Sequence, residues 1–96
     1  MNQKEILEWR IQNFPDPVSP MKQALVLAEE TGEVCRAVIK REQGIRGTYE
    51  SWSDNLKIEL AQTLVTLYAI AELEGFDLND YTAEYWETLK QRNFNV

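Results

Sequence analysis

The chain has 96 residues, of which 44% are apolar and 27% are charged. This length predicts one domain over residues 1–96, and the composition excludes a wholly disordered chain. Ten Lys and Arg residues against sixteen Asp and Glu residues give a net charge of −6, which argues against binding of a nucleic acid polymer through its phosphates. A domain this small buries a modest share of its surface on folding, so self-association is an expected source of stability.

The scarcity of His and Cys excludes further classes of function. The chain has no His and a single Cys, so His-based metal sites, Ser-His and Cys-His nucleophile pairs and internal disulfides are excluded. A single thiol fits a reducing compartment. No apolar run reaches the length of a membrane span, and the first part of the chain is charged throughout. We therefore expect neither a membrane partner nor a signal peptide, and a cytoplasmic location.

The first predicted helix runs from Asn2 to Asn13. Asn2 is a favourable N-cap, and Glu5 three residues later completes a capping signature. Segment 14–17 contains two prolines, which lack a backbone donor and disfavour helix in the residue before them. This segment therefore predicts a loop.

The second predicted helix is long. It begins after the N-cap Ser19, with Pro20 in the first turn, where a missing N–H costs nothing. Apolar residues recur at helical spacing as far as Gln43, and Gly44 then allows the chain to turn. The two glycines of segment 44–48 predict a loop.

The third predicted helix is capped by Ser51 or Ser53 and ends near Gly75. Its apolar residues occupy more than one face, which predicts a central helix. Asp77 predicts the start of a fourth helix, which ends at about Asn93. No segment alternates with the period of a strand, so the predicted fold class is all-α, and the short connections favour antiparallel neighbours.

Carboxylates interrupt the best apolar stretch of the second predicted helix. Glu29, Glu30 and Glu33 lie there, and the last two project from the same side of the helix. Glu59 and Gln62 repeat the same spacing on the third predicted helix. If the two helices lie side by side, these side chains converge, and oxygen ligands without His or thiolate select a hard cation such as Mg²⁺ or Mn²⁺. The alternative is a solvated acidic helix face that binds no ion.

These residues resemble the MazG-like nucleoside triphosphate pyrophosphohydrolases, part of an all-α superfamily that also contains dimeric dUTPases and dCTP pyrophosphatases. The signature of that family is EExxE on one helix and ExxD on a later one. The first half is intact from Glu29 to Glu33, and the second half reads Glu59-Leu60-Ala61-Gln62. The resemblance spans roughly residues 9–93 and implies a four-helix bundle-like fold of antiparallel helices, assembled as a homodimer or homotetramer. Gln62 stands where the family has a metal-binding Asp, so the site would carry one negative charge less.

The resemblance also implies a reaction. A nucleoside triphosphate, with ribose or deoxyribose, would be cleaved between its α- and β-phosphates to a monophosphate and pyrophosphate, in a house-cleaning role for the nucleotide pool. Glu29, Glu30, Glu33 and Glu59 would be the catalytic carboxylates. Glu30, Glu33, Glu59 and Gln62 would hold the cofactor Mg²⁺, for which Mn²⁺ could substitute. Glu29 would bind a second ion or accept a proton from the attacking water.

Cationic and aromatic side chains are candidates for contact with the substrate. Cations would bind the outer phosphates, and an aromatic ring would stack on the base. The plainer interpretation is that the cations are surface charges and that the aromatic residues fill a core or a subunit interface. The candidates are Arg46, Lys57, Lys90 and Asn93 for the phosphates, and Trp9 and Phe14 for the base.

Two other hypotheses stay open at this point. Because Gln62 is neutral, the chain could bind nucleotide or metal without catalysis. It could also be a helical oligomerisation module without a site. In that case neither Mg²⁺ nor a nucleotide would shift its melting temperature.

Overall fold

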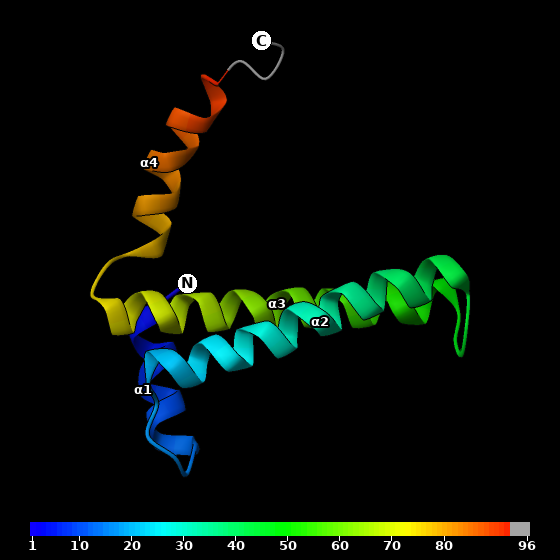
Figure 1. Cartoon of the computed structure of the whole chain (residues 1–96), viewed down its shortest axis with the longest axis horizontal. Helices are drawn as coiled ribbons and strands as arrows, with labels where there is room; N and C mark the ends of the chain where they lie inside the picture. The colour runs from blue at the N-terminus through cyan, green and yellow to red at the C-terminus, as the bar shows by residue number, and fades with distance from the viewer. Residues whose placement is uncertain (93–96) are drawn as a thin grey trace.

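The architecture consists of helices joined by short connections. The structure is a computed structural model that describes residues 1–92. In that part of the chain the elements are α1 (Gln3–Asn13), α2 (Pro20–Gln43), α3 (Tyr49–Glu74) and α4 (Leu78–Lys90), with no strand (Figure 1). The predicted all-α class is confirmed. No helix within residues 1–92 combines the length and the apolar character that crossing a bilayer requires.

Local capping chemistry explains where three of the helices begin. The side chains of Asn2, Ser19 and Asp77 accept hydrogen bonds from backbone N–H groups in the first turns of α1, α2 and α4, at 3.0, 3.2 and 2.9 Å. These caps satisfy donors that would otherwise have no partner within the helix. All three predicted caps are therefore confirmed.

The start of α3 differs from the prediction. Its N-cap is Thr48, whose Oγ1 accepts from the Ser51 backbone N–H at 3.0 Å, so neither Ser51 nor Ser53 is the cap. Ser51 instead completes the reciprocal half of a capping box, because its Oγ accepts from the Thr48 N–H at 2.9 Å. This pairing adds a turn to the front of the predicted helix.

The end of α4 also differs from the prediction. The helix stops at Lys90, with Gln91 as its C-cap, rather than continuing to about Asn93. Asn93 itself lies outside the described residues.

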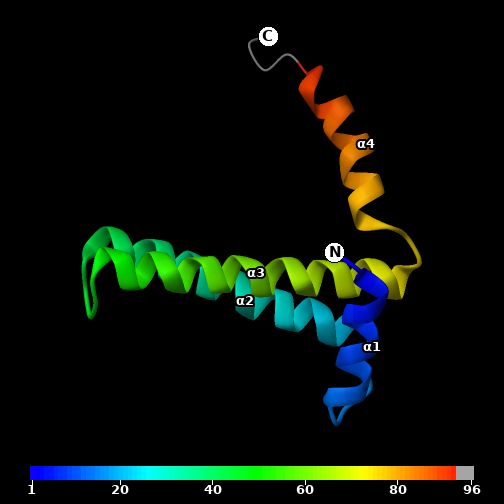
Figure 2. The same ribbon diagram turned by 180° about the vertical axis from the view of Figure 1, so that it is seen from behind.

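An antiparallel hairpin of α2 and α3 forms the body of the molecule (Figures 1 and 2). Gly44 ends α2 in the left-handed conformation at φ 66°, which a glycine adopts without steric cost. α3 packs against each of the other three helices, as expected for a central helix. α1 and α4 leave the hairpin toward opposite sides near the same end.

α4 does not close a bundle within one chain. It contacts the C-terminal part of α3, where the Tyr68 hydroxyl donates to Asn79 Oδ1 at 2.5 Å, and then projects away from the hairpin (Figure 1). Gln3 of α1 joins the same region, because its side chain accepts from the Leu78 N–H at 3.0 Å and donates to the Phe76 carbonyl. The antiparallel hairpin agrees with the predicted arrangement, but the fourth helix has no bundle partner in the described chain.

The core of the described chain is small. Its buried apolar residues are Ala37, Tyr68, Ala69 and Ala71. In contrast, Met21 and Leu25 on α2 are 76% and 67% exposed. The radius of gyration is 16.3 Å, whereas a compact chain of this length would have about 12 to 13 Å. The single chain therefore leaves much apolar surface uncovered.

Candidate functional site

A hollow lies where α1 meets the α2–α3 hairpin. This main hollow has a volume of about 620 Å³. Three carboxylates of α2, one amide and several apolar side chains of α3, and two residues of α1 surround it. The lining consists of Trp9, Arg10, Glu29, Glu30, Glu33, Ile58, Ala61, Gln62 and Val65.

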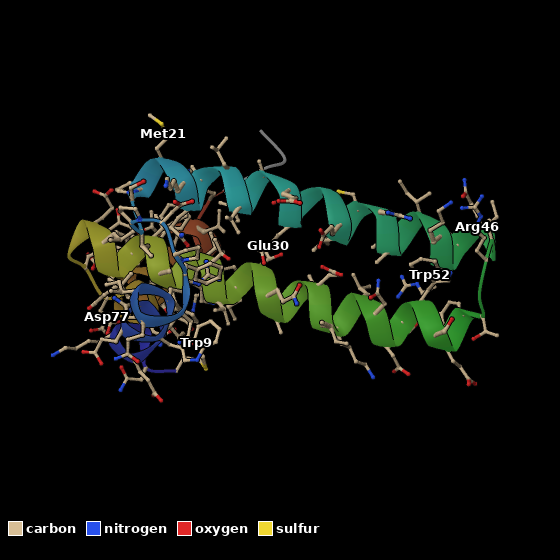
Figure 3. The ribbon with its side chains drawn as sticks, turned by 90° about the horizontal axis from the view of Figure 1, so that it is seen from below. Trp9, Met21, Glu30, Arg46, Trp52 and Asp77 are labelled. Carbon is tan, nitrogen blue, oxygen red and sulfur yellow. The ribbon has the colours of Figure 1, made fainter. Side chains whose placement is uncertain are left out.

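The structure brings together the two halves of the acidic motif. Glu29, Glu30 and Glu33 line the main hollow from α2, and Gln62 lines it from α3. Figure 3 shows the Glu30 side chain between the two helices of the hairpin. The antiparallel pairing of α2 and α3 therefore brings these four side chains to one hollow, whereas Glu59 does not line it.

Glu59 lies in an adjoining hollow of about 300 Å³, which Glu33 also lines. A hydrogen bond to the Glu33 carboxyl group raises the pKa of Glu59, with smaller contributions from desolvation and from the charges of Glu33 and Glu30. The buried Oε2 of Glu59 has no hydrogen-bond partner among the described residues. The carboxyl groups of Glu33 and Glu59 thus face each other across the helix pair.

The donor set fits a hard divalent cation. Carboxylate oxygens and an amide oxygen are ligands that Mg²⁺ accepts, and a cation would relieve the repulsion between Glu33 and Glu59 and give a partner to Glu59 Oε2. Within residues 1–92, however, no three acidic side chains lie close enough together to form a metal-binding cluster. Thr66 Oγ1 donates a hydrogen bond to one oxygen of Glu30.

The two aromatic candidates lie beside the main hollow. Trp9 lines it, and Phe14 lines a neighbouring hollow of about 300 Å³ that also includes Arg10 and Glu30. The rings of Trp9 and Phe14 pack edge to face, with centroids 6.2 Å apart and planes at 81°. The two packed rings thus lie beside the hollows that Glu30 lines.

The cationic candidates lie elsewhere. Arg46 is in the turn at the far end of the hairpin from Trp9 (Figure 3). Lys57 is exposed and pairs with Asp54 at 3.7 Å, and Lys90 on α4 pairs with Glu87 at 2.9 Å. None of these three cations lines the main hollow. Their contact with substrate, like that of Asn93 outside the described residues, stays a prediction.

A buried polar cluster that the sequence pattern does not indicate lies next to Glu30. Arg10 of α1 donates to Gln23 of α2, and its Nη2 donates to Thr66 Oγ1 of α3 at 2.9 Å. Burial lowers the pKa of the Arg10 guanidinium, and the charge of Glu30 partly offsets that effect. Thr66 follows Gln62 by one helical turn, and this spacing was the available signal. Arg10 has no comparable signal, because its contacts come from two other helices.

Most of the chain matches a known protein family. The family model described as the MazG nucleotide pyrophosphohydrolase domain matches residues 19–96. No curated protein and no solved structure matches the chain. The matched segment contains α2, α3 and α4, together with every residue of the acidic motif. The resemblance inferred from that motif is confirmed, and the chain belongs to the MazG nucleotide pyrophosphohydrolase family.

Proposed function

We propose that the protein is a Mg²⁺-dependent pyrophosphohydrolase of nucleoside triphosphates, with ribose or deoxyribose, in the cytoplasmic nucleotide pool. It would cleave between the α- and β-phosphates and release a monophosphate and pyrophosphate. The observation that carries the proposal is that Glu29, Glu30 and Glu33 of α2 line one hollow with Gln62 of α3, while Glu33 lines an adjoining hollow with Glu59 of α3. Family membership supports the same class of reaction.

In this proposal Glu30, Glu33, Glu59 and Gln62 hold the cation. When bound, Mg²⁺ or Mn²⁺ would neutralise phosphate charge and lower the pKa of an attacking water. Gln62 contributes a neutral oxygen, so the carboxylates supply all of the negative charge of the ligand set. Glu29 is exposed at the edge of the main hollow, where it can accept the proton of the water or help to hold a second ion.

The hollow itself supports binding of a nucleotide. Trp9 and Phe14 provide an aromatic surface on which a base can stack, at one side of the carboxylates. Arg46, Lys57 and Lys90 do not line the main hollow, so within one chain the bound cation and Arg10 would offset the phosphate charge.

We also propose that the enzyme works as a homodimer or homotetramer. Large apolar residues such as Leu25, Leu60 and Trp86 are exposed in the single chain. Water-exposed apolar area of this extent is typical of a surface that a partner covers.

Incubation with a panel of nucleoside triphosphates and Mg²⁺ tests the reaction, with monophosphate and pyrophosphate as the measured products. Glu30→Gln should lower kcat by at least about a hundredfold, because it removes a charged ligand of the cation. Glu84→Gln, an exposed carboxylate on α4, is the matched control and should match the wild type. The proposal fails if no triphosphate is cleaved, or if Glu30→Gln is as active as the control.

A non-catalytic nucleotide or metal binder is the second candidate function, and the neutral Gln62 favours it. This candidate predicts that Mg²⁺ with nucleotide raises the melting temperature without turnover, since any ligand that prefers the folded state stabilises it. Gln62→Asp should then introduce hydrolysis. If neither Mg²⁺ nor nucleotide shifts melting, a pure oligomerisation module is the better description.

A further inference from the structure

Arg10 is a buried cation in a helix that is otherwise mostly open to solvent. It is 8% exposed and is the buried residue of α1 among those described. A buried charge is costly unless partners satisfy it, so its surroundings show what holds it there. The residue precedes segment 19–96, which matches the family model.

Its hydrogen bonds lead to Glu30. Arg10 Nη2 donates to Thr66 Oγ1 at 2.9 Å, and the Thr66 hydroxyl donates to Glu30 Oε1. Arg10 Nη1 also donates to Gln23, which fixes the plane of the guanidinium. Arg10 of α1, Gln23 of α2 and Thr66 of α3 thus form one hydrogen-bonded cluster that ends on Glu30, which lines the main hollow.

Thr66 can link the position of Arg10 to that of the Glu30 carboxylate, because its hydroxyl accepts from one and has a single hydrogen to donate to the other. The side chain is 0% exposed, so water does not compete for that hydrogen. The alternative acceptor within reach is the Gln62 backbone carbonyl at 3.2 Å. By donating to the Thr66 oxygen, Arg10 makes the hydroxyl a stronger donor toward the Glu30 carboxylate. Glu30 is then held by one oxygen and keeps the other for a further ligand.

We propose that Arg10, acting through Thr66, is a positioning residue that holds the Glu30 carboxylate in the orientation in which it binds a divalent cation. The inference rests on the proposed Mg²⁺ site. It adds α1 to that site, although this helix lies outside the segment that matches the family.

Binding of Mn²⁺ to the full chain without nucleotide tests this proposal. The free ion is counted from its electron paramagnetic resonance signal. Thr66→Val keeps the buried volume and removes the hydroxyl, and it should raise the Kd for Mn²⁺ about tenfold, as losses behind metal ligands do. Arg10→Met should have a similar effect, and Thr66→Ser should bind like the wild type. Thr63→Val is the matched control, because the Thr63 hydroxyl bonds only the Glu59 backbone carbonyl at 2.8 Å in the described chain.

Melting curves separate positioning from folding. If Arg10→Met fails to fold, Thr66→Val and Thr66→Ser still decide the question. The inference is overturned if Thr66→Val remains folded and binds Mn²⁺ like the wild type while Glu30→Gln binds weakly. If the wild type binds no Mn²⁺, or if Glu30→Gln binds it equally well, the proposed metal site itself is wrong and the inference falls with it.

Discussion

At the scale of single residues, the Glu33–Glu59 contact is the clearest sign of unbalanced charge. A hydrogen bond to Glu33, desolvation and the charges of Glu33 and Glu30 raise the pKa of Glu59. The folded protein therefore binds a proton that the unfolded chain has already released at the same pH. Between the ordinary carboxyl value and the raised one, the free energy of unfolding must fall as pH rises.

This charge imbalance predicts a pH-dependent response to Mg²⁺. The melting temperature of the metal-free protein should be lower at about pH 8 than at about pH 5, and Mg²⁺ should raise it more at the upper value because a larger fraction of Glu59 is then ionised. Differential scanning calorimetry at both values measures the effect. Glu59→Gln should flatten the dependence. The same pH slope in Glu59→Gln and in the wild type would contradict the assignment.

At the scale of elements, capping chemistry decides how well the helices could be predicted. Asn2, Ser19 and Asp77 were identifiable because each meets its partner within three residues along the chain. At the third helix several hydroxyls compete, and the reciprocal pair of Thr48 and Ser51 is selected because it satisfies two backbone donors at once. The sequence thus allows several N-caps for α3, and only the hydrogen bonds of the folded turn show that Thr48 is the one used.

The same cap gives a stability prediction. Thr48→Ala should lower the free energy of unfolding by about 1 kcal/mol, because it removes the cap of the longest helix. Ser53→Ala is the matched comparison and should not lower the free energy of unfolding, because it removes a hydroxyl that makes no hydrogen bond within residues 1–92. The Ser53 hydroxyl is buried without a hydrogen-bond partner among the described residues. Urea unfolding at one fixed protein concentration measures both, and equal losses would show that Thr48 is not the functional cap.

At the scale of the whole molecule, exposed apolar surface predominates. The accessible area is 7296 Å², whereas a compact monomer of this mass would expose roughly 5,700 Å². On α2 an exposed stripe alternates steps of four and three residues, which is the spacing of a coiled-coil seam. This α2 seam consists of Met21, Leu25, Ala28, Gly32, Cys35 and Ile39. A Cβ atom placed on Gly32 would meet no atom of its own chain within 4 Å, so the described chain does not explain this glycine.

The α2 seam predicts self-association that a single charge should weaken. Leu25→Glu should raise the dissociation constant of the oligomer at least about tenfold, because the carboxylate would be buried without a partner. Ala24→Glu adds the same charge one residue away, outside the seam, and is the control. Light scattering coupled to size-exclusion chromatography measures the mass against 11.2 kDa for one chain. A wild-type mass of one chain would refute the prediction.

The acidic residues of the site could be predicted from the sequence, whereas the contacts of α1 and α4 with the hairpin could not. Glu30, Glu33 and Glu59 follow from helical spacing and from one assumption, that two long helices joined by a short loop run antiparallel. The position of α4 and the burial of Arg10 depend on contacts between segments far apart in sequence, such as Gln3 with Leu78 and Arg10 with Thr66. No local pattern encodes such contacts.

The placement of α1 bears on how the protein should be produced. A fragment that begins at residue 19, where the family match begins, would lose Gln3 and Arg10. Gln3 accepts a hydrogen bond from the first residue of α4, and Arg10 donates one to Thr66. Trimming would remove Trp9 and Arg10 from the lining of the main hollow and open the buried Thr66 hydroxyl to solvent. The segment that matches the family model is thus shorter than the set of helices that pack together, and expression vectors for this protein should retain α1.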